Sequence, residues 1–389
     1  MGATEGRQGK SQSRTLLLFS PVSLASMLAK GNVSYVRGYE HYFDDVYVAY
    51  LFGPRCNNVT MGCTRLMSLS TGRRLFDFLL APIRLFRLAR DVNAGAFLTA
   101  DLVFSWWTAV LLRLILNAKI ILMPVCIPEE VYSVTGRSLS GIPIAAERLL
   151  THLCYAAASK VITSRHVEEY IKWLSSDART ARKLQIVECI VDEFPPEQLL
   201  RELATAPDFA RPLSDPPQLL YVGRLHPEKM TMDLIETLAH LNGWGYRVRL
   251  VIAGEGPQER PMRARAAELG VADAIDWLGF VQAGDLAEVY RSADLFVSTI
   301  TGTSLREAGL AGLPVVGYNA DWVKSLLEHE CTALLVPRGD TVALAKQVVR
   351  AITEPDLRVR LRDNFHTLAL ARWNSGRIAY ALGETFGTR

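Results

Sequence analysis

Two basic residues follow the end of a predicted strand in the second half of the chain. The segment Tyr221-Val222-Gly223-Arg224-Leu225-His226-Pro227-Glu228-Lys229 leads from an apolar run into a loop. At Gly223 the backbone can turn away from the sheet, so Arg224 leaves from the carboxyl end of the strand and Lys229 follows after a short loop. Such cations at the mouth of a cleft can hold a diphosphate and offset the charge on a departing nucleoside diphosphate. The same pattern also fits a solvated surface loop, so both interpretations stay open.

A second segment combines small hydroxyl residues with a glutamate at the beginning of a predicted helix. Gly302, Thr303, Ser304 and Leu305 follow an apolar run, and Glu307 lies about one helical turn further on. Backbone N–H groups at a helix start can bind phosphate, helped by the helix dipole. A carboxylate at this place can accept hydrogen bonds from both hydroxyls of a ribose. The alternative for Glu307 is an ordinary acidic residue in the first turn of a helix.

Short apolar runs alternate with helical patterns along the chain, which is typical of parallel sheets covered by helices. In the first half we expect strands at 15–19, 45–51, 119–125, 160–163 and 184–190. Helices are expected there at 106–116, 145–158 and 165–173. The second half predicts strands at 218–222, 248–253, 274–278, 294–297, 313–317 and 334–337. Its helices are expected at 232–241, at 284–292 and from 342 to the end. A further helix is expected after the glycine-rich turn 253–257, and the glycines of that turn can be explained by turn geometry alone.

A proline-rich connector separates the two halves. Residues 192–217 contain Pro195-Pro196 and Pro216-Pro217, and paired prolines can continue neither a helix nor a central strand. We therefore expect an α/β protein with two Rossmann-like doubly wound domains, 14–195 and 215–370, that face a cleft. Ligands of such sheets gather at the carboxyl ends of the strands.

The composition fits a folded protein of this size. The chain has 389 residues, of which 49% are hydrophobic and 21% charged, so it can bury a sizeable core. The formal net charge is only +3 and the second half has no concentrated basic stripe, so we expect no nucleic-acid partner. The 6 cysteines are scattered without CxxC or paired histidine spacing, which argues against a zinc site and fits cytosolic thiols.

Hydropathy in the first half argues against a signal peptide and a spanning helix. The apolar run 15–19 is too short for the former, and Arg113, Asn117 and Lys119 interrupt the run 102–125. We therefore expect a cytoplasmic protein. Residues 65–90 mix arginines with leucines and phenylalanines at three- and four-residue steps, which predicts a basic amphipathic helix or helix pair. Such a segment can make peripheral contact with an anionic membrane; the alternative is a helix packed on its own domain with solvated arginines.

Motifs of the second half occur in an order and at a spacing that resemble family 4 glycosyltransferases of the GT-B fold. They are Gly223-Arg224…Lys229, Ala253-Gly254-Glu255-Gly256, Leu278-Gly279-Phe280 and Glu307-Ala308…Ala311-Gly312-Leu313-Pro314-Val315-Val316. The resemblance extends over 218–337 and is fainter in the first half. It implies two Rossmann-like domains and a C-terminal helix, about 372–389, that packs back onto the first domain.

The resemblance also implies an activity. A sugar moves from a nucleotide-sugar donor to an acceptor hydroxyl, with retention of configuration and without a metal ion or other cofactor. Arg224 and Lys229 are then the catalytic cations that contact the donor diphosphate, and Glu307 binds the ribose. Further donor contacts are expected at Gly31, Gly223, Gly254, Phe280, Gly302, Thr303, Ser304 and Leu305. The lack of an Asp-x-Asp motif agrees with metal independence, and the basic amphipathic segment favours a glycan or lipid-linked acceptor at the cytoplasmic membrane face.

The sequence departs from this family in several places. Thr299 stands eight residues before Glu307, where members carry a glutamate that points to the donor sugar. Lys30-Gly31 stands where members often have Gly-Gly, so Gly31 either lets a backbone approach the diphosphate or makes a simple turn. A histidine expected after the run 119–125 is missing. Rival functions therefore stay open: a sugar-nucleotide epimerase of similar shape, or a non-catalytic nucleotide-sugar-binding or scaffold protein.

Overall fold

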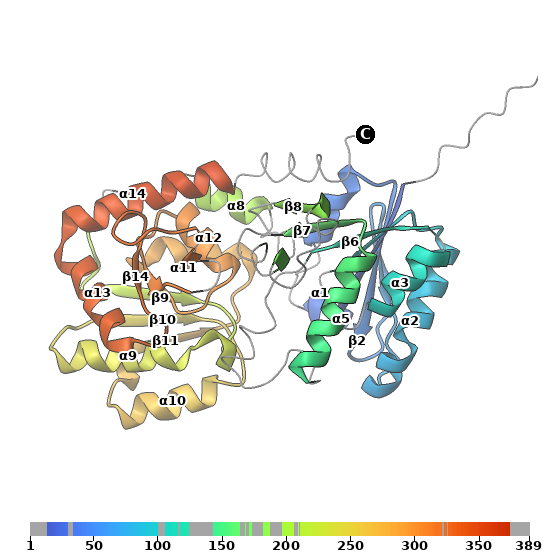
Figure 1. Ribbon diagram of the computed structural model, residues 1–389. Coiled ribbons are helices and arrows are strands. Elements are labelled where there is room, and N and C mark those ends of the chain that lie inside the picture. The colour runs from blue at the N-terminus through green and yellow to red at the C-terminus, as the bar shows by residue number, and fades with distance from the viewer. Residues whose placement is uncertain are drawn as a thin grey trace, which may run out of the picture.

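The chain folds into two α/β units, each built on its own sheet (Figure 1). The computed structural model describes residues 14–29, 34–99, 106–115, 117–123, 143–163, 168, 171–172, 182–186, 197–205, 209, 211–320, 323–324 and 326–373. Gly31, most of the helix expected at 165–173 and most of the C-terminal helix expected at 372–389 lie outside these residues. The predicted fold class, two doubly wound units with mainly parallel sheets, is confirmed.

The first sheet has the strand order β3-β4-β2-β1-β5-β6-β7-β8, and only β3 runs antiparallel to its neighbour. Leu16 and Leu18 are buried on one face of β1, while Leu17 and Phe19 are buried on the other, so helices must cover both faces. The strands are β1 (Thr15–Ser23), β2 (Asp45–Phe52), β3 (Val59–Met61), β4 (Thr64–Ser68), β5 (Ala96–Thr99), β6 (Lys119–Leu122), β7 (Lys160–Thr163) and β8 (Leu184–Ile186). One face is covered by α2 (Arg74–Asp91), α3 (Trp106–Ile115) and α5 (Ile144–Ala157), the other by α1 (Leu24–Ala29) and the 3-10 helix η1 (Ser34–His41).

The second sheet is parallel throughout, with the order β11-β10-β9-β12-β13-β14. Its strands are β9 (Gln218–Val222), β10 (Arg249–Ala253), β11 (Ile275–Gly279), β12 (Leu295–Ser298), β13 (Val315–Tyr318) and β14 (Leu334–Val336). One face packs on α9 (Met232–Gly243), α10 (Glu259–Glu268), α13 (Thr341–Thr353) and the beginning of α14 (Pro355–Arg372). The other face packs on α8 (Glu197–Ala204), α11 (Ala283–Ser292), α12 (Thr303–Leu310) and the end of α14. Two 3-10 turns, η2 (Pro227–Lys229) and η3 (Ala272–Ala274), complete this unit.

The segment 65–90 differs from the amphipathic helix or helix pair predicted for it. Its beginning belongs to β4, where Leu66 is fully buried and Arg65 donates to Asp45 of the neighbouring strand β2 at 2.6 Å. Helical periodicity therefore holds only from Arg74 onward, in α2. The prediction of a helix at residues 65–68 was wrong because buried pairing with β2 decides their conformation.

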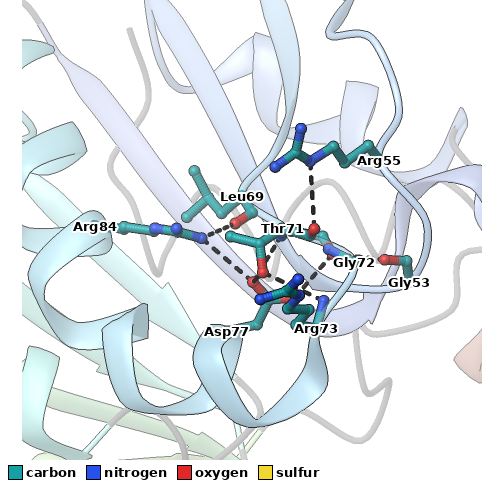
Figure 2. A network of polar contacts seen from close by, with 9 residues as sticks. Gly53, Arg55, Leu69, Thr71, Gly72, Arg73, Asp77 and Arg84 are labelled. Carbon is teal, nitrogen blue, oxygen red and sulfur yellow. Dashed lines mark hydrogen bonds and ion pairs between the residues drawn. The ribbon is translucent and has the colours of Figure 1, made fainter.

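A buried carboxylate fixes the beginning of α2. Asp77 is 1% exposed and accepts hydrogen bonds from the backbone N–H and the hydroxyl of Thr71, both at 2.7 Å, and from the hydroxyl of Ser70 at 2.9 Å (Figure 2). Arg84 pairs with the same carboxylate and donates to Leu69 O at 2.6 Å. Burial acts to raise the pKa of Asp77, but these hydrogen bonds and the charge of Arg84 outweigh it and hold the pKa below its ordinary value.

Replacing Asp77 is expected to destabilise the first unit. In Asp77→Asn the half-buried donors of Thr71 and Arg84 lose a charged acceptor, which costs on the order of 2–3 kcal/mol of unfolding free energy. Because the folded-state pKa of Asp77 lies below the unfolded-state value, its stabilisation is complete above the unfolded-state pKa and is lost as the pH falls through the folded-state pKa. Denaturant unfolding should therefore give a higher free energy of unfolding for wild type than for Asp77→Asn at neutral pH. This difference in unfolding free energy should disappear in acid.

Asp91→Asn is the matched control, because Asp91 lies on the same helix and its ion pair with Arg90 is exposed on both sides. Surface pairs of this kind contribute about 0–1 kcal/mol. Equal effects of the two substitutions at neutral pH would contradict the role assigned to Asp77.

Candidate functional site

The strand order of the second sheet reverses between β9 and β12. From β9 the chain adds β10 and then β11 on one side, and β12, β13 and β14 follow on the other side. Leu219 and Leu220 of β9 pair directly with Leu295 and Phe296 of β12. The connections after these two strands lead to opposite sides, and ligands of open α/β sheets bind at such a point. We refer to the carboxyl ends of β9 and β12, with the loops around them, as the crevice.

The loop after β9 is held by backbone contacts with the loop after β10. Gly223 N donates to Ala253 O at 3.0 Å, and Leu225 N donates to Glu255 O at 2.9 Å. A Cβ atom added at Gly254 would overlap the carbonyl oxygen of Gly223, so only glycine permits this approach. Gly223 and Gly254 therefore shape the crevice through their backbones, which agrees with the turn interpretation of Gly254.

The two basic residues of the β9 loop have different surroundings. The Arg224 side chain is 69% exposed and its Nη2 lies 2.7 Å from Oε1 of Glu228. Lys229 is half-buried at the end of η2. An exposed ion pair contributes only about 0–1 kcal/mol, so Arg224 can leave Glu228 for an anionic ligand at low cost.

Thr299 follows β12, at the position where the family resemblance predicts a glutamate. Its side chain is 1% exposed, and its hydroxyl donates to the backbone carbonyl of Lys229 at 2.7 Å. This bond joins the loop after β12 to the loop after β9, across the reversal of strand order. Thr299 therefore positions the backbone of Lys229 and presents no carboxylate to the crevice. The sequence does not reveal this role, because the two residues are 70 positions apart.

The beginning of α12 lies directly after this loop. Gly302 is its N-cap residue, is exposed, and has no side chain that could occupy the first N–H groups. Ser304 and Leu305 are buried, so the exposed Gly302 and the half-buried Thr303 are the residues of this helix start that face solvent. A helix N-terminus offers unpaired N–H groups and a partial positive charge, and both favour a phosphate group.

Glu307 is buried in α12, with 6% of its surface exposed. Tyr290 of α11 donates its hydroxyl to Oε2 of Glu307 at 2.7 Å, and the same hydroxyl lies 3.2 Å from Ser304 O. Burial and the charge of Glu307 raise the pKa of Tyr290 well above its ordinary value, so the phenol stays a donor. A buried carboxylate with a fixed orientation argues against the alternative of an ordinary solvated acid at a helix start. Sequence reasoning missed Tyr290, because its position fits the apolar face of α11.

The structure brings most of the predicted donor contacts to one edge of the second sheet. Phe280 directly follows β11, is 39% exposed, and donates its N–H to Oε1 of Glu255 at 3.3 Å. The other contacts follow the three adjacent strands: Gly254 after β10, Gly223, Arg224 and Lys229 after β9, and Gly302, Thr303, Ser304, Leu305 and Glu307 after β12. Gly31 lies outside the described residues, so its contact stays a prediction.

In the described part of the chain, no three His, Cys, Asp or Glu side chains lie close enough together to hold a metal ion. Metal independence stays a prediction from the resemblance. Among the helices described, none combines the length and apolarity that a membrane span requires.

Residues 206–366 match the family model described as "Glycosyl transferases group 1". Among curated proteins, the chain is 29% identical to an alpha-D-kanosaminyltransferase of Streptomyces kanamyceticus, over 42% of this chain and 43% of that protein. It is 32% identical to a phosphatidyl-myo-inositol mannosyltransferase of Mycobacterium leprae, over 43% of this chain and 46% of that protein. These matches span about half the length of the curated relatives or less.

Solved structures resemble the whole chain. Sucrose-phosphate synthase from Thermosynechococcus elongatus superposes with a TM-score of 0.74 at 18% identity, covering 96% of this chain and 98% of that one. The Anabaena protein HepE in complex with UDP-glucose superposes with a TM-score of 0.72 at 16% identity, covering 95% of this chain and 98% of that one. At these identities the likeness establishes the shared two-domain fold.

Removing the Thr299 hydroxyl is expected to weaken anion binding at the crevice. In Thr299→Val the carbonyl of Lys229 loses this donor, which costs about 1 kcal/mol of stability and loosens the Lys229 end of the β9 loop. The affinity for nucleoside diphosphates should fall several-fold in calorimetric titrations, because Lys229 loses its contact with the loop after β12.

Thr237→Val is the matched control. The buried Thr237 donates to the backbone carbonyl of Asp233 at the same distance, 2.7 Å, inside α9. This variant should lose comparable stability and keep its nucleotide affinity. Equal affinities of the two variants would contradict a positioning role for Thr299.

Proposed function

We propose, on the premise that residues 206–366 belong to the glycosyl transferases group 1 family and that the chain has the GT-B fold, that this protein is a glycosyltransferase. It transfers a sugar from a nucleotide-sugar donor to an acceptor hydroxyl. The observation that carries the proposal is the meeting of two loops at the reversal of strand order. One brings Arg224 and Lys229, and the other brings the beginning of α12 with the buried Glu307.

The proposed chemistry is electrostatic. As the bond to the sugar breaks, negative charge develops on the leaving nucleoside diphosphate, where Arg224, Lys229 and the N-terminus of α12 stabilise it. Glu307, oriented by Tyr290, accepts the ribose hydroxyls and sets the position of the diphosphate. Thr299 places no carboxylate beside the donor sugar, so we infer a mechanism without a protein nucleophile at that position. Retention of configuration is proposed from the family resemblance alone. The UDP-glucose bound by HepE and the GDP-mannose named for mycobacterial relatives leave the nucleobase open.

The outer side of the first unit supports a lipid-linked acceptor at a membrane surface. α2, α3 and α5 cover the same face of the first sheet and expose large apolar side chains outward: Phe76, Leu79, Ile83, Leu114, Ile115, Leu149 and Leu153. Arg87 of α2 and its N-cap residue Arg73 are exposed, as are Phe76, Leu79 and Ile83 of the same helix. Apolar side chains flanked by arginines complement an anionic lipid surface. The names of two relatives contain lipids, a phosphatidyl-myo-inositol mannosyltransferase and an alpha-monoglucosyldiacylglycerol synthase.

The activity is tested by incubating the protein with a panel of UDP-, GDP- and ADP-sugars, with and without lipid and glycan acceptors. We expect release of nucleoside diphosphate that depends on an acceptor. Interconversion of nucleotide sugars without an acceptor would identify an epimerase, and binding without release in every combination would identify a scaffold. Either outcome would overturn the proposal.

Arg224→Ala and Glu307→Ala should each lower the affinity for the nucleoside diphosphate at least about tenfold, because each removes hydrogen bonds to or from a charged group. Arg263→Ala is the control. Arg263 forms a comparable exposed i,i+4 ion pair with Glu259, but it lies on α10, away from the crevice. Unchanged affinity in both site variants would refute the site.

Membrane docking is tested by flotation with vesicles of phosphatidylcholine and phosphatidylglycerol. The double variant Leu79→Ser/Ile83→Ser should reduce vesicle binding several-fold, because it removes apolar surface from the centre of the exposed α2 stripe. Val359→Ser/Leu370→Ser changes two comparably exposed apolar residues of α14 and should bind like wild type. A wild-type protein that stays entirely unbound would contradict membrane docking.

A further inference from the structure

A polar pocket lies at the carboxyl ends of β2 and β4, on the first unit. It has a volume of about 410 Å³ and is lined by Arg55, Cys56, Asn57, Asn58, Ser68 and Ser70. The first four residues follow β2, and the two serines end β4 or follow it. Because β2 and β4 are parallel, both loops lie at the same edge of the sheet, which is the edge where α/β sheets hold ligands.

Arg55 is anchored in this pocket by one nitrogen. Its Nε donates to the backbone carbonyl of Thr71 at 3.3 Å. Within the described part of the chain, its two terminal nitrogens have no acceptor. An arginine held through Nε keeps a planar pair of N–H donors in a fixed direction, which suits bidentate binding of an oxyanion.

Further donors lie in the pocket beside Arg55. Asn58 accepts a hydrogen bond from Ser68 N through Oδ1 at 3.0 Å, which orients its amide and leaves the Nδ2 donors unused by the residues described. The hydroxyl of Ser68 has no recorded partner among the same residues. Three side chains with unused donors therefore line the pocket, and no carboxylate is among its lining residues.

The floor of the pocket is rigid. Figure 2 shows the loop 69–73 held between Arg55 on one side and Asp77 with Arg84 on the other. Ser70 adds a contact on the β2 side, because its one hydroxyl proton, which also faces Asp77, lies between that carboxylate and the carbonyl oxygen of Gly53, 2.5 Å from the hydroxyl oxygen. The Asp77 carboxylate beneath this loop is buried and pairs with Arg84, whose positive charge offsets its repulsion of an anion in the pocket. Donors held on a rigid frame bind an anion with little ordering cost.

We propose that this pocket binds a phosphate group carried by the acceptor. A phosphate presents oxygens in several directions, which matches the guanidinium of Arg55 together with the Asn58 amide and the Ser68 hydroxyl. The loop of the pocket leads into α2, whose exposed apolar side chains begin at Phe76. A lipid phosphate and a water-soluble phosphate ester share this chemistry. That the phosphate belongs to the acceptor rests on the proposed function, whereas phosphate binding at this pocket does not.

The test compares two ligands and three variants of the full-length protein by calorimetry. Arg55→Gln should lower the affinity for glycerol phosphate at least about tenfold and leave the affinity for the nucleoside diphosphate unchanged. Arg224→Ala should do the reverse. Arg87→Gln removes an exposed arginine of α2 outside the pocket and should change neither affinity. Because Arg55→Gln and Arg224→Ala are expected to affect different ligands, the result can refute phosphate binding at the pocket without refuting the donor site, and the reverse.

Vesicles of phosphatidylcholine with and without phosphatidylglycerol identify the source of the phosphate. A lipid source predicts that Arg55→Gln weakens binding to the phosphatidylglycerol vesicles more than Arg87→Gln does. A soluble source predicts equal small losses on vesicles together with the tenfold loss for glycerol phosphate. No binding of glycerol phosphate by wild type, or equal losses in Arg55→Gln and Arg87→Gln for glycerol phosphate, would overturn the proposal.

Discussion

The reversal of strand order between β9 and β12 is the constraint on which the candidate site depends. It brings together two loops that are far apart in the sequence, and the hydrogen bond from Thr299 to the carbonyl of Lys229 joins them directly. Glycines at 223 and 254 let the neighbouring loop pack against the β9 loop, so the backbone around Arg224 is fixed from both sides. The resulting arrangement has a cation-bearing loop, a helix N-terminus and a buried carboxylate around one crevice.

The surfaces of the two units suit different ligands of the proposed reaction. The second unit provides charge and hydrogen-bonding groups that suit a nucleoside diphosphate, and its Tyr290 orients Glu307 through a hydrogen bond. The first unit exposes apolar side chains on the helices of one face and a donor-lined pocket at the carboxyl edge of its sheet. Asp77 connects these two features, because its network fixes both the beginning of α2 and the loop that forms the pocket. A phosphate-bearing lipid would meet both features at once.

The fold of the second unit could be predicted from the sequence because its strands are apolar runs bounded by glycine and proline. β9 was predicted with its observed bounds, and the motif residues follow the strands as expected. In the first unit β5 was missed, since Ala96–Thr99 is a short, fully buried run with no alternation to mark it. Long-range contacts could not be predicted from the sequence, because they join residues that only the fold brings together. Examples are the bond of Thr299 to Lys229, the bond of Tyr290 to Glu307, and the pocket around Arg55.

A crystal structure of the protein with the nucleoside diphosphate that it binds most tightly tests the central claim most directly. We expect the diphosphate to lie between Arg224, Lys229 and the beginning of α12, with a ribose hydroxyl within hydrogen-bond distance of Glu307. The Thr299 hydroxyl should still donate to the Lys229 carbonyl in that complex. A nucleotide bound elsewhere, or one that leaves Glu307 without a ribose contact, would contradict the account.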